Sequence, residues 1–272
     1  MSSSAAKECK MNEKMMVKIA VAMLGIAGIC RAAGCVKSLE VCPAKCADAN
    51  SVEVILGRLN QAVSALKSYQ GRVEYRFSQP ILESETLRKG VLYYAKFGEK
   101  SKLRINFQTL KQDDEKEQEY IEQYIFDGVW LTHIDEQIKE VKRRQLAEPN
   151  EPVDAFELAR RNFPIIGFGK TEDLEKEFEI KLQAESEPSG FTKLHLKVRP
   201  DSVYKDDYTS IDFWIDKQTS LPAKIVAVST EEDIYEIRLL DAKVNEGIDE
   251  KVFEVKVPAG FGEEIIPLKK ND

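Results

Sequence analysis

The feature of this sequence that most constrains its fold is a two-residue hydrophobic period that returns along most of the chain. Val73, Tyr75 and Phe77 alternate with charged residues, a pattern typical of strands with one buried and one solvated face. Equally clear cases are 102–107, 193–198 and 211–216, and further strand candidates are 87–97, 119–126, 129–134, 137–145, 178–185, 221–229 and 233–243. Turn signals such as Asp127-Gly128 and Asp216-Lys217 separate the segments. The sequence therefore predicts about eleven short strands in an antiparallel meander.

Two segments have a helical period instead. In 51–67, apolar residues recur at three- and four-residue spacing, which predicts an amphipathic helix capped by Asp48 or Ser51. A second helical patch is expected within 153–178. Since so few helices cannot cover both faces of a long sheet, we predict a mainly β fold with the helices laid across one apolar face.

The N-terminal segment has the pattern of an export signal. Residues 19–30 carry no charge and follow Lys14 and Lys18, and the next basic residues end this apolar run before it could span a membrane. We therefore predict a signal peptide at 1–34, a tether at 35–50, a folded domain at 51–272 and a periplasmic location.

All five cysteines precede residue 47, so the domain itself is expected to fold without disulfides. Small residues before Cys35 make it a candidate for lipidation, which would anchor the protein in a membrane; the alternative is an unmodified tether. Cys42 and Cys46 form either a local disulfide or part of that tether, and their spacing alone is weak evidence for zinc.

Charge and motifs exclude several function classes. The chain has 40 basic and 47 acidic residues, a net charge of −7 that disfavours nucleic-acid binding. Gly169-Lys170-Thr171 lacks the rest of a phosphate-binding loop, and His133, Asp135 and Glu136 need not face one way on a strand that leads into a turn. No serine elbow or cysteine nucleophile occurs in the predicted domain. We therefore expect no enzyme, no cofactor and no metal site.

Several motifs from residue 51 onward occur in a recognisable order. The helix is followed by a strand at 70–79, a glycine-led strand that begins Gly90-Val91-Leu92, and a strand at 102–107. Phe126-Asp127-Gly128-Val129-Trp130-Leu131 is the most specific of the motifs, and 216–225 and 253–261 complete the order. Together they resemble the periplasmic lipoprotein-carrier family, LolA with its outer-membrane relative LolB. The resemblance implies a half-open antiparallel β-barrel with a helical lid over an apolar cavity.

The same resemblance implies a function. It makes the protein an envelope carrier that binds acyl chains of lipoproteins or lipids and sorts or transports outer-membrane lipoproteins. Its partners would be those ligands, an inner-membrane release machinery and an outer-membrane acceptor, and we expect a monomer. The alternative is a lipid-sensing or envelope-stress regulatory module of the same fold.

Alternating residues on the predicted strands are the candidates for the wall of the acyl cavity. Because the period of two cannot separate a ligand cavity from ordinary core, both interpretations stay open. The candidates are Tyr75, Phe77, Leu92, Tyr94, Leu103, Ile105, Phe107 and Trp130. The family's carriers have an arginine that holds the lid shut in the empty form; here the corresponding place reads Ala95-Lys96-Phe97, so Lys96 is the candidate lid-gating residue.

Overall fold

The computed structural model describes residues 51–98, 100–155, 171–183 and 190–268. The predicted signal peptide (1–34) and tether (35–50), with Cys35, Cys42 and Cys46, lie outside the described residues. Most of the second predicted helical patch, residues 156–170, lies outside them as well.

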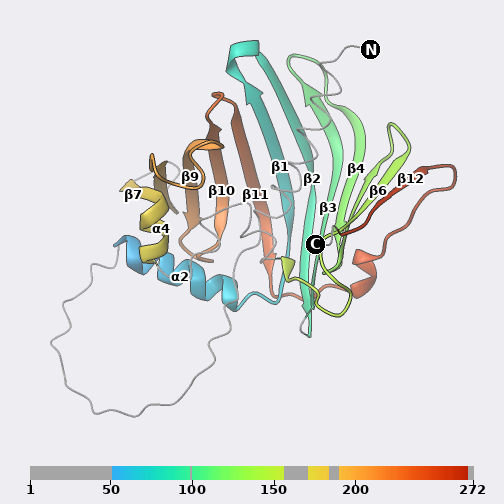
Figure 1. Cartoon of the computed structure of the whole chain (residues 1–272), viewed down its shortest axis with the longest axis horizontal. Helices are drawn as coiled ribbons and strands as arrows, with labels where there is room; N and C mark the ends of the chain where they lie inside the picture. Colours follow the sequence, from blue (N-terminus) through green and yellow to red (C-terminus); the bar gives the residue numbers. More distant parts are fainter. Residues whose placement is uncertain (1–50, 99, 156–170, 184–189, 269–272) are drawn as a thin grey trace, which may run out of the picture.

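The described residues form one sheet of twelve strands, in the order β12-β6-β5-β4-β3-β2-β1-β11-β10-β9-β8-β7 (Figure 1). The strands are β1 (Ser68–Gln79), β2 (Ser84–Phe97), β3 (Lys100–Gln112), β4 (Gln118–Phe126), β5 (Trp130–Asp135), β6 (Glu140–Gln145), β7 (Phe178–Gln183), β8 (Phe191–Val198), β9 (Tyr208–Asp216), β10 (Pro222–Ser229), β11 (Ile234–Val244) and β12 (Gly262–Ile266).

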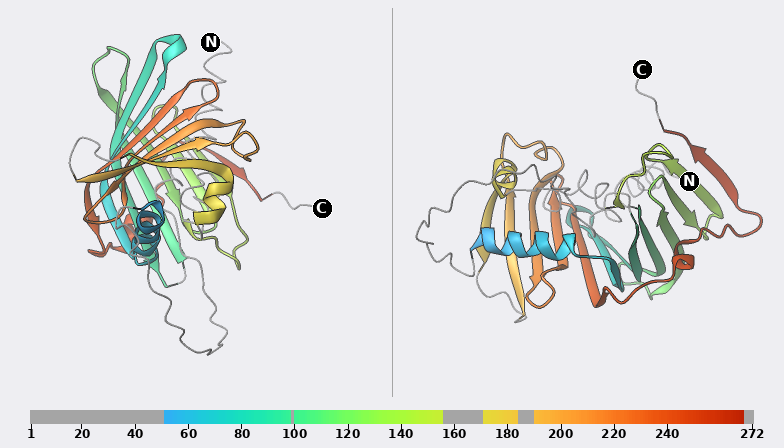
Figure 2. Two further views of the ribbon diagram at one scale, coloured as in Figure 1. Left: turned by 90° about the vertical axis from the view of Figure 1, so that its left-hand side faces the viewer. Right: turned by 90° about the horizontal axis from the view of Figure 1, so that it is seen from below.

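Two antiparallel meanders make up this sheet. The first runs from β1 to β6 and the second from β7 to β11, and they join where β1 pairs with β11 in the antiparallel sense. The sheet curves strongly while its end strands β7 and β12 stay apart, so it forms an open half-barrel (Figure 2). The predicted mainly β, half-open architecture is therefore confirmed.

The last strand differs from the prediction. β12 pairs with β6 in parallel, which makes twelve strands rather than about eleven and adds one parallel pair to an otherwise antiparallel sheet. Sequence periodicity missed β12 because its residues are mostly exposed and do not alternate.

The amphipathic helix is present as α2 (Val52–Ser64). Of the two predicted caps, Ser51 acts: its hydroxyl oxygen accepts a hydrogen bond from the backbone N–H of Val54 at 3.3 Å. A short helix, α4 (Thr171–Glu177), lies in the second predicted patch. Both helices lie over the part of the sheet that contains β7 to β11 (Figures 1 and 2).

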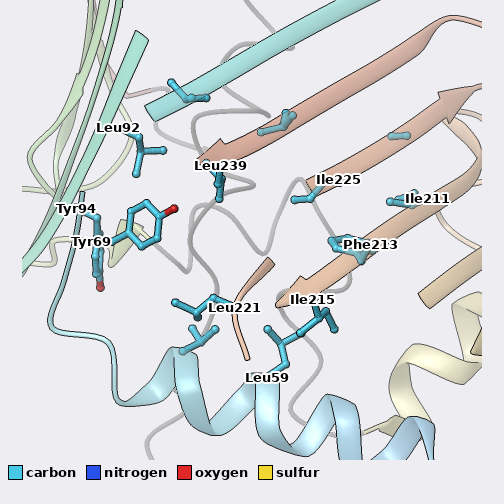
Figure 3. Close-up of a cluster of buried hydrophobic side chains, with 14 of the residues drawn as sticks. Leu59, Tyr69, Leu92, Tyr94, Ile211, Phe213, Ile215, Leu221, Ile225 and Leu239 are labelled. Carbon is cyan, nitrogen blue, oxygen red and sulfur yellow. The ribbon is translucent and has the colours of Figure 1, made fainter. Parts of the chain in front are cut away.

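The main core lies on the concave side of the sheet. Leu59 of α2 points toward Ile215 and Leu221, and Tyr69, Leu92 and Tyr94 continue the same cluster from β1 and β2 (Figure 3). A second, small cluster of Ile125, Ile134 and Val141 lies on the convex side, where Val255 and Phe261 pack against it. The segment after the 3-10 helix η3 (Glu250–Phe253) thus covers the outer face of β4 to β6.

Candidate functional site

The concave face of the sheet carries the predicted cavity residues. Six of them belong to the main core cluster and are at most 1% exposed: Tyr75, Leu92, Tyr94, Leu103, Ile105 and Phe107. Phe77 is partly buried at the edge of the same cluster, and its ring stacks on that of Tyr235 with the centroids 5.0 Å apart. The strand parity read from the sequence therefore brings seven of the eight candidates to one face.

Trp130 is the exception, and its predicted place on the cavity wall is wrong. On β4 and β5, Phe126 pairs with Leu131, and both belong to the concave cluster. The side chain of Trp130 therefore points to the same side of the sheet as that of Ile134, which lies in the convex cluster. Its ring lies 5.8 Å from the guanidinium carbon of Arg143. Because Trp130 and Leu131 are adjacent apolar residues on β5, the sequence alone could not tell which of the two faces the concave side.

The concave face depends locally on Gly90. This residue lies between Val73 of β1 and Phe107 of β3, next to an irregularity in the register of β2 and β3. A Cβ atom at this position would lie 2.0 Å from the carbonyl oxygen of Asn106, far inside van der Waals contact. Only glycine therefore lets β2 and β3 approach this closely.

A group of polar side chains interrupts the apolar concave face. This concave polar cluster consists of Arg88 on β2, Glu122 and Tyr124 on β4, and His133 and Asp135 on β5. Arg88 Nε lies 3.3 Å from Glu122 Oε2, and both side chains are less than a tenth exposed. Sequence reasoning missed this cluster, although Arg88 has the same parity as the apolar Leu92 and Tyr94, which was a usable signal.

Hydrogen bonds hold one oxygen of Glu122. Its Oε1 accepts from Tyr124 Oη at 2.7 Å and lies 2.9 Å from His133 Nε2. The rings of Tyr124 and His133 stack with centroids 4.4 Å apart. Burial alone would raise the pKa of Glu122, but the His133 hydrogen bond and the Arg88 charge outweigh burial and lower that pKa. Glu122 is therefore a carboxylate at neutral pH.

Three members of this cluster have the chemistry of metal ligands. Glu122, His133 and Asp135 each offer a ligand atom, and these atoms lie within 4.8 Å of one another. The sequence left open whether His133, Asp135 and Glu136 face one way. In the structure His133 and Asp135 are two residues apart on β5, and both point to the concave side. The donor set suits a divalent cation such as zinc, whereas the neighbouring Arg88 charge opposes one.

Lys96 lies near the C-terminal end of β2, next to the segment that follows α2. Its backbone N–H donates to the carbonyl oxygen of Lys67 at 2.8 Å. The side chain of Lys96 is half-buried, and its gating role stays a prediction. The lipidation candidate Cys35 lies outside the described residues.

The second histidine is on the convex face. His195 Nδ1 lies 2.6 Å from Asp212 Oδ1, and Lys193 Nζ lies 3.1 Å from the other oxygen of that carboxylate. Lys193 and Lys224 each place the Nζ atom 4.7 Å from the centroid of the Trp214 ring. These contacts form a half-exposed network of charges on the outer face, apart from the concave cluster.

Among the helices within the described residues, none has the length and apolar character needed to cross a membrane.

Comparison with known proteins finds no matching family model and no matching curated protein. Solved structures do match. An uncharacterized conserved protein from Thermus thermophilus is 12% identical, with a TM-score of 0.45 over 79% of this chain and 97% of that one. The MucA/MucB complex from Pseudomonas aeruginosa matches at 16% identity and a TM-score of 0.43, covering 74% of this chain and 60% of that one.

A LolA superfamily protein from Nitrosomonas europaea is also among the matches. It is 15% identical, with a TM-score of 0.32 over 74% of this chain and 96% of that one.

Proposed function

We propose that this protein binds the acyl chains of lipoproteins or lipids against the concave face of its half-barrel, as an envelope carrier that sorts outer-membrane lipoproteins. The observation that supports the proposal is the large cluster of apolar side chains that both meanders contribute to that face, from Leu194 and Phe213 on one side to Leu103 and Phe126 on the other. Each methylene withdrawn from water contributes about 0.8 kcal/mol, so binding a long chain needs such a surface and no catalytic group.

The location and partners belong to the same proposal. The signal-like pattern at 14–34 supports export to the periplasm, and Cys35 is the candidate anchor. An inner-membrane release machinery would supply the lipoprotein and an outer-membrane acceptor would receive it. The protein would act without a cofactor, as a non-enzymatic carrier.

A pair of variants at neighbouring positions tests where the acyl chain binds. Leu92 is fully buried on the concave face, whereas Val91, the residue before it, is half-buried and points to the convex face. We expect Leu92→Trp to reduce binding of a fluorescent fatty-acyl probe by at least tenfold because the indole fills the space that the chain needs. Val91→Trp, the matched control, should bind like the wild type.

Thermal unfolding followed by circular dichroism on the same samples distinguishes whether Leu92 lines a ligand-binding surface or belongs to a packed core. If Leu92→Trp melts far below the control, Leu92 belongs to a packed core that tolerates no extra volume. If the wild type binds no acyl probe at all, the proposed function is refuted. Binding of a lipoprotein without its transfer to acceptor membranes would favour the regulatory module over the carrier.

A further inference from the structure

Two buried donor atoms on the concave face, Tyr75 Oη and Arg88 Nε, lack a hydrogen-bonded acceptor among the described residues. Tyr75 on β1 and Arg88 on β2 are directly paired across the two strands, and both side chains point to the concave side. Within the described part of the chain, neither Tyr75 Oη nor Arg88 Nε has a hydrogen-bond partner, although both atoms are buried. Buried donors of this kind usually have a partner, because leaving one unpaired costs free energy.

The existing partner of Arg88 does not satisfy this donor. Glu122 Oε2 lies 3.3 Å from Arg88 Nε, close enough for an ion pair, yet neither atom makes a hydrogen bond. The other oxygen of Glu122 is held by Tyr124 and His133. The carboxylate of Glu122 is thus positioned from the β5 side, and neither Tyr75 Oη nor Arg88 Nε has a hydrogen-bonded acceptor in the described part of the chain.

The surroundings of this pair have two different characters. On one side of Tyr75, its β11 partner is the buried Ile237, and further along β1 the concave residues are apolar as far as Tyr69. Tyr69 lies six residues from Tyr75, a distance of about 20 Å along a strand. On the other side are Glu122, His133 and the rest of the concave polar cluster. The pair therefore lies between a mainly apolar region, which also holds the hydroxyl groups of Tyr208 and Tyr235, and the concave polar cluster.

We propose that Tyr75 and Arg88 bind the anionic head, a carboxylate or a phosphate, of an amphiphile whose acyl chain lies along the apolar part of the concave face. This inference rests on the proposed function and names the class of ligand. A charged oxygen is the acceptor that gains most from a guanidinium and a phenol hydroxyl in a buried setting. It would give both donors the hydrogen bond that they lack, and it would fix which end of the ligand faces the polar cluster.

Removing one hydroxyl tests the inference with little risk to the fold. Tyr75→Phe deletes an unpaired buried group, so the unliganded protein should be as stable as the wild type or more stable. Dodecanoate and dodecanol differ only in the head, and each is titrated by displacement of a fluorescent fatty-acyl probe. We expect Tyr75→Phe to weaken dodecanoate about tenfold, the loss of one charge-assisted hydrogen bond, and to leave dodecanol unchanged.

Tyr93→Phe is the control, since it removes a tyrosine hydroxyl from the convex face of β2, away from the proposed binding surface. Its affinities for both ligands should equal those of the wild type. Arg88→Lys should also weaken dodecanoate more than dodecanol, because the ammonium keeps the charge but loses the planar donors.

Each failure has a distinct meaning. If dodecanoate and dodecanol bind the wild type equally well and Tyr75→Phe changes neither, the anionic head site is wrong while the acyl-binding function stands. If dodecyl phosphate responds to Tyr75→Phe and dodecanoate does not, the head is a phosphate. If neither ligand binds the wild type, the proposed function fails and the inference fails with it.

Discussion

The buried ion pair between Arg88 and Glu122 should contribute a measurable coupling energy to the stability of the protein. Both side chains are buried, with exposed fractions of 8% and 6%, and their charged atoms lie 3.3 Å apart. At the effective dielectric constant of about 20 that suits protein interiors, two unit charges at this distance attract by about 5 kcal/mol. Much of this attraction offsets the cost of removing both groups from water.

Removing one partner leaves the other buried without its counter-charge. We expect Arg88→Met and Glu122→Gln each to lower the free energy of unfolding by about 3 kcal/mol. The double variant should lose about as much as one single variant, which gives a coupling energy of about 3 kcal/mol. Urea unfolding at neutral pH, followed by circular dichroism, measures all four free energies.

The exposed pair of Arg72 and Asp241 supplies the control for this cycle. These side chains are 63% and 67% exposed, and their ion pair joins β1 to the neighbouring β11 on the solvent side. A double-mutant cycle with alanine should give a coupling of about 0.5 kcal/mol, because water screens the charges. A coupling between Arg88 and Glu122 as small as this would refute the view that they form a desolvated pair.

Three further predictions concern stability. Burial raises the pKa of Glu122, but the hydrogen bond with His133, the charge of Arg88 and the remaining contacts together outweigh it and lower that pKa from 4.5. This carboxylate therefore contributes stability that is complete above about pH 4.5 and is lost as the pH falls through the folded pKa. Urea unfolding at about pH 7 and at about pH 3 should show a smaller loss on acidification for Glu122→Gln than for the wild type. Gly90→Ala should lower the melting temperature by many degrees since its Cβ would meet the carbonyl oxygen of Asn106, whereas Gly57→Ala on α2 has open space and should be neutral or stabilising. Reductant should leave the melting curve unchanged because every cysteine precedes residue 47; a large drop would show that a cysteine outside the described residues stabilises the domain.

The sequence alone determined much of the local structure. Strand side chains alternate, so the parity of Tyr75, Leu92 and Phe107 could be read before any pairing was known. The helix Val52–Ser64 followed from its apolar stripe and a nearby serine cap. Where two apolar residues are adjacent, as at Trp130 and Leu131, the two-residue period cannot tell which of them faces the core. Only the pairing of β5 with β4 showed that Leu131 lies on the concave face.

Long-range pairing decided the rest. Residues of β1 and β11 are separated by more than 150 positions, yet their pairing joins the two meanders into one curved face. Glu122 reaches Arg88 only because β3 holds β2 and β4 in a fixed register on either side of it. Side-chain alternation is a property of each strand by itself, so the sequence reveals it. Which strands become neighbours depends on the free energy of the whole sheet, and a buried charge pair formed across three strands emerges only with the complete fold.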